Sequence, residues 1–184
     1  MQRFTRDREM STPDELWVLQ HPSTYTLGLS GHPEHLLDEV SIPLIHTDRG
    51  GQITYHGPGQ VIIYVLVNLS RRHLKVRELV YLMEEAIIQT LQTVGIHPER
   101  RPGAPGVYVD GAKIASLGLR IRRGCSYHGL SLNGPMDLAP FKHIHPCGFS
   151  GLPVTSTTAL GLSLSVTELE ERLLSSLQKQ FEPI

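Results

Sequence analysis

Cysteine is scarce in this chain, and long apolar segments are missing. The sequence holds two cysteines, Cys125 and Cys147, and the segment from Met1 to Met10 is charged rather than apolar. Two cysteines make no disulfide framework, and such a segment is not a secretory signal. No run approaches the ~18 consecutive apolar residues of a transmembrane helix. We therefore expect a protein of the reducing cytoplasm with no membrane partner.

An excess of charge of one sign is also absent. The net charge of −1 predicts no bulk attraction to nucleic acid or to a membrane surface. Basic residues do cluster locally, in the segments 71–77 and 120–123. Each cluster is either a solvated turn or a landing surface for an acidic protein partner.

Several common site motifs are missing. The chain has no Gly-x-x-x-x-Gly-Lys-Ser/Thr loop for a nucleotide, no Gly-x-Ser-x-Gly nucleophile turn and no Cys-x-x-Cys pair. Ten histidines keep metal binding open, and His143-x-His145-x-Cys147 offers the nitrogen and sulfur ligands that zinc takes. Because structural zinc sites use other spacings, we expect no metal site.

The order of expected elements indicates a single α+β domain, the default at this length. Apolar residues at three- and four-residue steps predict a helix from Val76 to Val94, which Gly95 would end. Ser165 and Glu168 form a capping box that opens a final helix reaching Phe181. The expected strands cover residues 16–19, 25–29, 42–46, 61–67, 107–109, 112–122 and 125–133, with a two-residue hairpin turn at Asp110-Gly111.

What the chain does have is a glycine-rich stretch, Arg49-Gly50-Gly51-Gln52-Ile53-Thr54-Tyr55-His56-Gly57-Pro58-Gly59-Gln60, just before its most apolar run. Glycine lets the backbone approach a ligand closely. The stretch therefore predicts a wall of a binding site. A tight turn at Gly57-Pro58-Gly59 is the alternative. His56 and His128 lie beside glycines, and each either lines the site or has a structural role.

Two further residues are candidates for chemistry. Cys147 lies in a loop and precedes Gly148, whose N–H could face a developing oxyanion, whereas Cys125 fits a buried structural role at the start of a strand. In strand alternation Lys113 shares a face with apolar residues, and a buried lysine can act as a base and stabilise a thiolate. The alternative is that Lys113, close to the hairpin turn, extends its ammonium group to water.

Five blocks of the sequence together resemble the lipoyl(octanoyl) transferases. The resemblance covers Pro13 to Gly151, and the blocks follow the family's order and spacing. They are residues 49–60, Ala104-Pro105-Gly106-Val107-Tyr108-Val109, Lys113-Ile114-Ala115-Ser116-Leu117-Gly118-Leu119-Arg120-Ile121, His128-Gly129-Leu130-Ser131-Leu132-Asn133 and Pro146-Cys147-Gly148.

The resemblance implies an acyltransferase that moves octanoyl from acyl carrier protein to a lysine of a lipoyl domain. It implies that Cys147 carries the acyl group as a thioester and that Lys113 tunes it and acts as acid and base. The implied fold is a mixed, mostly antiparallel sheet flanked by helices, like the catalytic domain of the biotinyl/lipoyl protein ligases. The implied acyl-binding residues are Arg49, Gly50, Gly51, Gln52, Ile53, Thr54, Tyr55, His56, Ser116, Leu117, Gly118, Gly129, Leu130 and Ser131.

The resemblance also sets expectations about partners and extent. The partners would be octanoyl-acyl carrier protein and the lipoyl domains of 2-oxoacid dehydrogenase complexes and the glycine cleavage H protein, with no cofactor and a monomeric enzyme. Residues 1–184 would form one acyltransferase domain that lacks the family's N-terminal strand. Two rival functions stay open: an ATP-dependent lipoate or biotin ligase on the same fold, and a catalytically inactive binding module.

Overall fold

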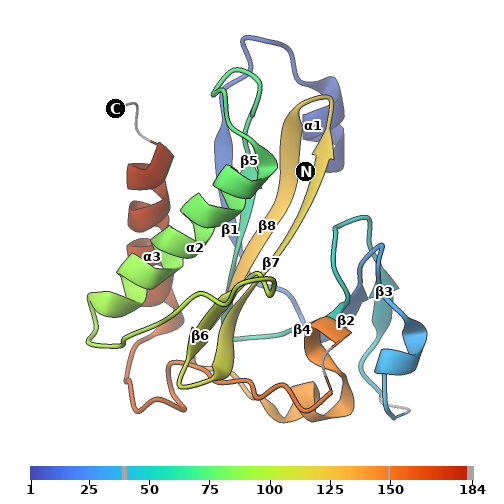
Figure 1. Cartoon of the computed structure of the whole chain (residues 1–184), viewed down its shortest axis with the longest axis vertical. Helices are drawn as coiled ribbons and strands as arrows, with labels where there is room; N and C mark the ends of the chain where they lie inside the picture. Colours follow the sequence, from blue (N-terminus) through green and yellow to red (C-terminus); the bar gives the residue numbers. More distant parts are fainter. Residues whose placement is uncertain (39–40, 149, 182–184) are drawn as a thin grey trace.

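The computed structural model describes residues 1–38, 41–148 and 150–181, with the backbone alone described at Cys147. These residues form two sheets and their helices, which confirms the α+β fold expected from the sequence (Figure 1). The helices are α1 (Gln2–Asp7), α2 (Val76–Gln92) and α3 (Val166–Phe181), with short 3-10 turns η1 (Pro33–His35), η2 (Ala139–His143) and η3 (Pro146–Gly148). The strands are β1 (Glu15–Leu19), β2 (Thr24–Leu27), β3 (Leu44–His46), β4 (Ile53–His56), β5 (Gln60–Leu66), β6 (Val107–Val109), β7 (Ala112–Arg122) and β8 (Cys125–Asn133).

The large sheet has the strand order β1-β5-β8-β7-β6, and its neighbouring strands are antiparallel. Both faces of β5 are covered, as its apolar run predicts. Ile63 and Val65 enter the main core, while Ile62 and Tyr64 point to the opposite face. Because side chains alternate along a strand, β5 separates the core from a cavity.

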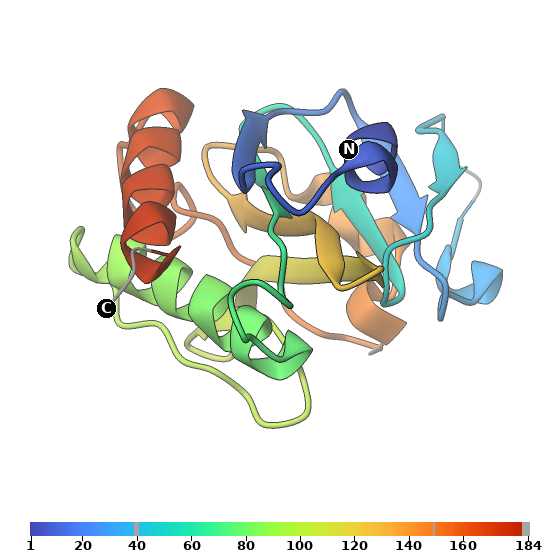
Figure 2. The ribbon, with the colours of Figure 1, turned by 90° about the horizontal axis from the view of Figure 1, so that it is seen from above.

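The helices α2 and α3 cover one face of the large sheet (Figures 1 and 2). The predicted apolar stripe of α2 is confirmed, since Leu79, Met83, Ile87 and Leu91 are fully buried. The helix ends slightly before the expected Val94. The capping box of α3 is also confirmed: the Glu168 N–H donates to Ser165 Oγ, and the Ser165 N–H donates to Glu168 Oε2. Neither these helices nor any other in the described ranges is long and apolar enough to cross a membrane.

The small sheet has the order β3-β2-β4 and lies across from the helices, on the other side of the large sheet (Figure 2). Its β2 strand pairs in parallel with β3 and antiparallel with β4. The glycine-rich stretch is therefore not all loop, because its middle forms β4. Ile53, Thr54 and Tyr55 favour strands, and Tyr55 and Ile53 pack with Tyr25 and Phe141 in a second core.

One of the two basic clusters is largely built into the fold. Arg71 and Arg72 both form ion pairs with Asp14, and Arg8 pairs with the same carboxylate. Arg72 also donates to the carbonyl of Phe181 at the end of α3. Arg71 and Arg72 therefore fit neither alternative for this cluster: they are not a simple solvated turn, and they are not a free docking surface. Arg120, Arg122 and Arg123, at the tip of the β7–β8 hairpin, are exposed.

Candidate active site

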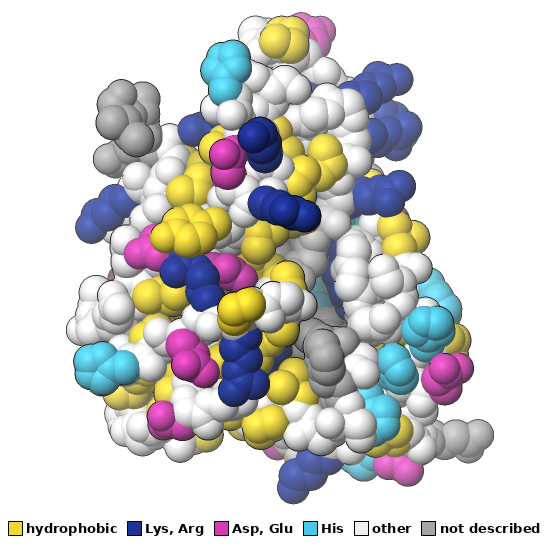
Figure 3. All heavy atoms as spheres, in the orientation of Figure 1, with side chains coloured by type: hydrophobic (Ala, Val, Ile, Leu, Met, Phe, Trp, Pro, Cys, Tyr) yellow, Lys and Arg dark blue, Asp and Glu magenta, His cyan; other side chains and the backbone are white. Residues whose placement is uncertain are grey.

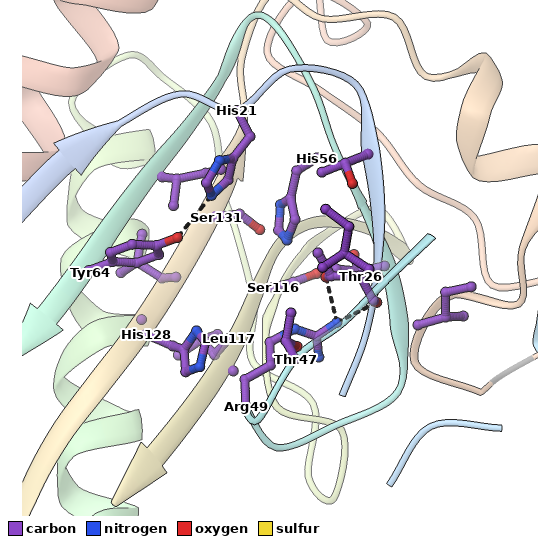
Figure 4. A pocket seen from close by; sticks show the side chains of 18 of the residues that line it. His21, Thr26, Thr47, Arg49, His56, Tyr64, Ser116, Leu117, His128 and Ser131 are labelled. Atoms are coloured by element: carbon purple, nitrogen blue, oxygen red, sulfur yellow. Dashed lines mark hydrogen bonds between the residues drawn. The ribbon is translucent and has the colours of Figure 1, made fainter. Parts of the chain in front are cut away.

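A cavity of about 380 Å³ lies between the large and the small sheet. This volume falls within the range of small-molecule sites in proteins. Its walls come from β2 and β4 on one side and from β5, β7 and β8 on the other, and the side chains that surround it are drawn in Figure 4. Segments far apart in the sequence thus meet at one concave site.

The predicted acyl-binding residues converge on this cavity. Those that line it are Arg49, Gln52, Ile53, Thr54, His56, Ser116, Leu117, Gly118, Gly129, Leu130 and Ser131. Among the residues described, Gly50, Gly51 and Tyr55 are not part of the lining. Gly50 instead donates its N–H to the carbonyl of Leu119, and Tyr55 packs against Phe141 in the second core.

Glycine is needed where the walls come close together. Gly118 and Gly129 face each other across β7 and β8. A Cβ on Gly129 would collide with the carbonyl of Ile63, and one on Gly118 would lie 2.9 Å from Cδ of Arg49. These contacts explain why two wall positions hold no side chain.

Arg49 fastens the glycine-rich segment to β2. Its guanidinium donates to the carbonyls of Thr26, Gly50 and Gln52 at 2.7 to 2.9 Å, and to Thr26 Oγ1 (Figure 4). A planar guanidinium with several donors suits such a multiple contact. Arg49 therefore shapes the cavity wall as well as lining it.

His56 lines the cavity as a neutral ring. Its Nδ1 lies 2.7 Å from Gln60 Oε1, while Gln60 Nε2 donates to the carbonyl of Tyr55 and to Asn133 Oδ1. Because the amide nitrogen of Gln60 is occupied as a donor, its oxygen must accept from His56, which places the proton on Nδ1. Burial lowers the pKa of His56 to about 4. His56 Nε2 is therefore an acceptor at neutral pH.

Three polar side chains, those of His21, Tyr64 and His128, also line the cavity, and the sequence interpretation missed the first two. His21 Nε2 lies 2.9 Å from the hydroxyl of Tyr64, and His128 Nε2 lies 2.7 Å from Asp48 Oδ1. The Tyr127 hydroxyl donates to the other oxygen of Asp48. Burial lowers the pKa of His128, and its bond to Asp48 offsets this only in part. Of these residues, only His128 was marked as a candidate, by its neighbouring glycine.

His128 has an unusual backbone for its position. Its φ is +59° although it lies within β8. A residue other than glycine in this region carries strain, which tends to accumulate at functional sites. His128 thus reaches both the cavity and Asp48 at a conformational cost.

Lys113 is buried at the start of β7, with 4% of its surface exposed. Its Nζ donates to the carbonyl of Pro105 at 2.9 Å and lies 5.4 Å from the ring centre of Tyr108. The alternative that Lys113 extends to water is therefore wrong. The physical reason is the segment of residues 153–155, which pairs with the backbone of Lys113 through a bridge at Val154 and covers the start of β7.

The backbone of Cys147 lies in η3, which packs against β4. The next residue, Gly148, approaches the side chains of Gln52 and His35. Gln52 lines the cavity, so η3 adjoins the site. The side chain of Cys147 lies outside the described residues, and its pairing with Lys113 stays a prediction.

The zinc alternative involves the same segment. His143 Nδ1 lies 2.8 Å from Asp38 Oδ2, and the His145 ring packs edge-on against His35. Within the described side chains, no three of His, Cys, Asp or Glu gather as metal ligands would. The combination His143-x-His145-x-Cys147 includes the side chain of Cys147, which lies outside the described residues.

Comparison with known proteins identifies the family. The model of the lipoyl protein ligase A/B catalytic domain matches residues 1–178. The chain belongs to this family. An octanoyltransferase of Azoarcus sp. is 58% identical over the whole chain and 81% of that relative, and one of Aromatoleum aromaticum is 56% identical over the whole chain and 80% of that relative. These relatives confirm the resemblance seen in the sequence motifs and support the predicted class of enzyme, an octanoyl-transferring acyltransferase.

Solved structures confirm the expected fold. The bipartite lipoate protein ligase of Thermoplasma acidophilum matches with a TM-score of 0.80 and 16% identity, over 97% of this chain and 75% of that one. The biotin protein ligase of Aquifex aeolicus, in complex with biotin and ATP, matches with a TM-score of 0.58 and 15% identity, over 84% and 69%. At these identities the likeness concerns the fold alone.

Proposed function

We propose that this enzyme transfers an octanoyl group from octanoyl-acyl carrier protein to a lysine of a lipoyl domain, through a thioester on Cys147. The observation that carries the proposal is the cavity between the sheets, because three separate motif blocks of the family supply its walls. The 58% identical octanoyltransferase supports the choice of acyl group. Residues 1–184 act as one acyltransferase domain in this proposal.

The cavity holds the acyl chain. Transfer of an eight-carbon chain from water to an apolar site would contribute roughly 5 kcal/mol, at ~0.8 kcal/mol for each methylene. Gly118 and Gly129 let the chain lie against backbone, and Leu117, Leu130 and Ile53 supply apolar contact. One extra or missing methylene changes the discrimination between two substrates by about 1–3 kcal/mol, so selection for chain length is modest.

In the first step, the Cys147 thiolate attacks the carbonyl carbon of the octanoyl thioester. A new C–S bond to Cys147 forms while the bond to the carrier's sulfur breaks, and the carrier's thiol leaves with a proton from the Lys113 ammonium. The N–H of Gly148, expected from the sequence to face the oxyanion, instead donates to the carbonyl of His145 at 2.9 Å. The thioester donor is already activated, so this step consumes no ATP.

In the second step, the lysine amine of the acceptor attacks the acyl-enzyme. An amide C–N bond forms, the C–S bond to Cys147 breaks, and the neutral Lys113 amine takes the surplus proton. The charged Lys113 and the Cys147 thiolate are thereby restored. The burial of Lys113 supports this role, because water does not compete for its proton.

In this proposal the enzyme is monomeric and cytoplasmic, and both of its partners are proteins. The acceptors are lipoyl domains of 2-oxoacid dehydrogenase complexes and of the glycine cleavage H protein. The exposed basic cluster of residues 120–123 at the hairpin tip is the docking surface for the acidic carrier. Figure 3 shows Lys and Arg side chains gathered at the upper right, where Figure 1 places that tip and α1.

The test is an intact-mass measurement after mixing the enzyme with octanoyl-acyl carrier protein. We expect one octanoyl adduct that is lost in Cys147→Ala and retained in Cys125→Ala, which alters the other, structural cysteine. An adduct that survives in Cys147→Ala would refute the assignment. Activity with free octanoate and ATP, but none with the octanoyl carrier, would favour a ligase; no adduct under any condition would favour a binding module.

A further inference from the structure

One peptide unit near Lys113 is held at both ends. The carbonyl of Pro105 accepts a hydrogen bond from Lys113 Nζ at 2.9 Å. The N–H of the same peptide, on Gly106, donates to Glu84 Oε1 at 2.9 Å. The Pro105–Gly106 peptide thus lies directly between a carboxylate and an ammonium group.

Both charged groups are buried. Glu84, on the inner side of α2, is 7% exposed, close to the 4% of Lys113. The second oxygen of Glu84 accepts from Arg100 Nε at 3.2 Å. Buried charges are retained when they are paired and hydrogen-bonded, and here the pairing passes through a peptide.

The backbone is shaped for this arrangement. Gly106 has a φ of +137°, and a Cβ there would lie 2.5 Å from Lys113 Cε and 2.8 Å from the carbonyl of Ala115. The loop that carries it is anchored by two backbone hydrogen bonds between Glu99 and Tyr108. No side chain other than hydrogen fits at position 106 without moving the lysine.

We propose that Glu84 is a positioning residue for Lys113, acting through the Pro105–Gly106 peptide. A negative charge at the N–H end polarises the peptide, and hydrogen bonds in a chain strengthen one another. The Pro105 carbonyl therefore becomes a stronger acceptor for the ammonium group and holds it at one place. The inference rests on the proposed function, in which Lys113 serves the reaction.

A purely structural role is the competing explanation, since Glu84 also ties α2 to the loop of residues 99–106. The neighbouring Glu85 provides a matched control. Glu85 Oε2 accepts from the same Arg100 at 2.6 Å, but its hydrogen bonds go to Arg100 and Gln89 rather than to Gly106. Glu84→Gln keeps an oxygen for the Gly106 N–H, removes the charge and places an amide nitrogen where Arg100 Nε had an acceptor. Glu85→Gln also removes a carboxylate beside Arg100, so it controls for that loss.

The experiment measures single-turnover formation of the octanoyl adduct in the full chain, together with the apparent KM for octanoyl-acyl carrier protein and the melting temperature. Charged hydrogen bonds are about twice as strong as neutral ones. We expect Glu84→Gln to slow acylation about tenfold with KM unchanged, because Glu84 does not line the cavity. Glu85→Gln should keep the normal rate.

A double-mutant cycle separates positioning from stability. If Glu84 acts through Lys113, then Glu84→Gln causes no further loss of rate in a Lys113→Ala background. Equal losses in both backgrounds, an unchanged rate in Glu84→Gln, or equal losses in Glu84→Gln and Glu85→Gln would each overturn the inference. If Glu84→Gln does not fold, Glu84→Asp is the second variant, because it retains the negative charge. We expect Glu84→Asp to acylate at a rate close to that of the unaltered protein if its carboxylate still accepts from the Gly106 N–H.

Different experimental results would contradict the proposed function and this inference. Absence of the Cys147 adduct in the unaltered protein, or a normal rate in Lys113→Ala, contradicts the mechanism itself. A slow Lys113→Ala variant combined with a normal Glu84→Gln variant contradicts only the role of Glu84.

Discussion

Gln60 Oε1 accepts the Nδ1 proton of His56 over 2.7 Å and fixes its tautomer, while burial lowers the pKa of His56 and keeps the imidazole neutral at the cavity wall. Further hydrogen bonds lead inward from Gln60: its side chain donates to Asn133 Oδ1, and Asn133 donates to the carbonyl of Thr155. Thr155 in turn donates its N–H to the carbonyl of Lys113. A cavity residue and the strand that carries Lys113 are therefore joined by one hydrogen-bond chain.

The depressed pKa of His56 predicts acid sensitivity. The unfolded chain binds a proton near pH 6.5, whereas the folded protein resists it until about pH 4. Stability is thus full above pH 6.5 and falls as the pH drops toward 4, by roughly 2–3 kcal/mol from this residue. Urea unfolding at several pH values should show a shallower fall in His56→Gln, while the exposed control His97→Gln should follow the unaltered protein. Parallel curves for His56→Gln would contradict the assignment.

A methyl group at position 106 should disable the enzyme. Gly106→Ala drives a Cβ toward Lys113 Cε and strains the backbone, so we expect at least a hundredfold loss in the rate of adduct formation, equivalent to ~2.7 kcal/mol in the barrier. Gly103→Ala is the control, because it has a φ of +75° with no atom within 4 Å of the added Cβ. It should lose about 1 kcal/mol of stability with a normal rate. Similar rates in the two variants would show that the clash at position 106 is relieved without moving Lys113.

Removing the Asp48 charge should loosen one end of the cavity. Asp48 accepts from Tyr127 and His128, and although burial opposes ionisation, these bonds hold its pKa below the ordinary value. We expect Asp48→Asn to lower the free energy of unfolding by about 1–3 kcal/mol and to raise KM for a small octanoyl thioester. Asp38→Asn breaks an exposed contact to His143 and should cost less than about 0.5 kcal/mol. Equal effects of the two substitutions would remove Asp48 from the site.

Charge reversal at the hairpin tip should affect only the protein substrate. We expect Arg122→Glu to raise KM for octanoyl-acyl carrier protein several-fold and to leave KM for a neutral octanoyl thioester unchanged. High salt should have the same selective effect on the unaltered enzyme, because it screens exposed charges. Arg172→Glu, at an exposed position of α3, is the control. A similar rise in KM with the small thioester would argue against docking at this surface.

Local patterns in the sequence predicted the elements well because the causes are local. Three features depend on neighbouring residues: the buried stripe of α2 at three- and four-residue steps, the Asp110-Gly111 turn with φ of +46° and +85°, and the capping box at Ser165. The β4 strand was obscured because the glycines around Ile53–His56 suggest a loop. Its pairing with β2 is a tertiary contact that the glycine pattern does not reveal.

The site was predictable only in part. The motif blocks pointed to most of the wall, but Tyr64 lies within an apolar run, and His21 lies beyond the expected strand of residues 16–19 and outside the motif blocks. Their contact at 2.9 Å depends on the register between β1 and β5. The positive φ of His128 and the convergence of Arg71 and Arg72 on Asp14 likewise come from contacts between distant residues.

The convergence on Asp14 couples parts of the chain that are far apart in sequence. Arg8 follows α1, Arg71 and Arg72 follow β5, and Arg72 also holds the last turn of α3. These segments should therefore open in a single step in amide hydrogen exchange, rather than fray independently as chain ends usually do. One carboxylate thereby makes the beginning and the end of the described fold a single cooperative unit.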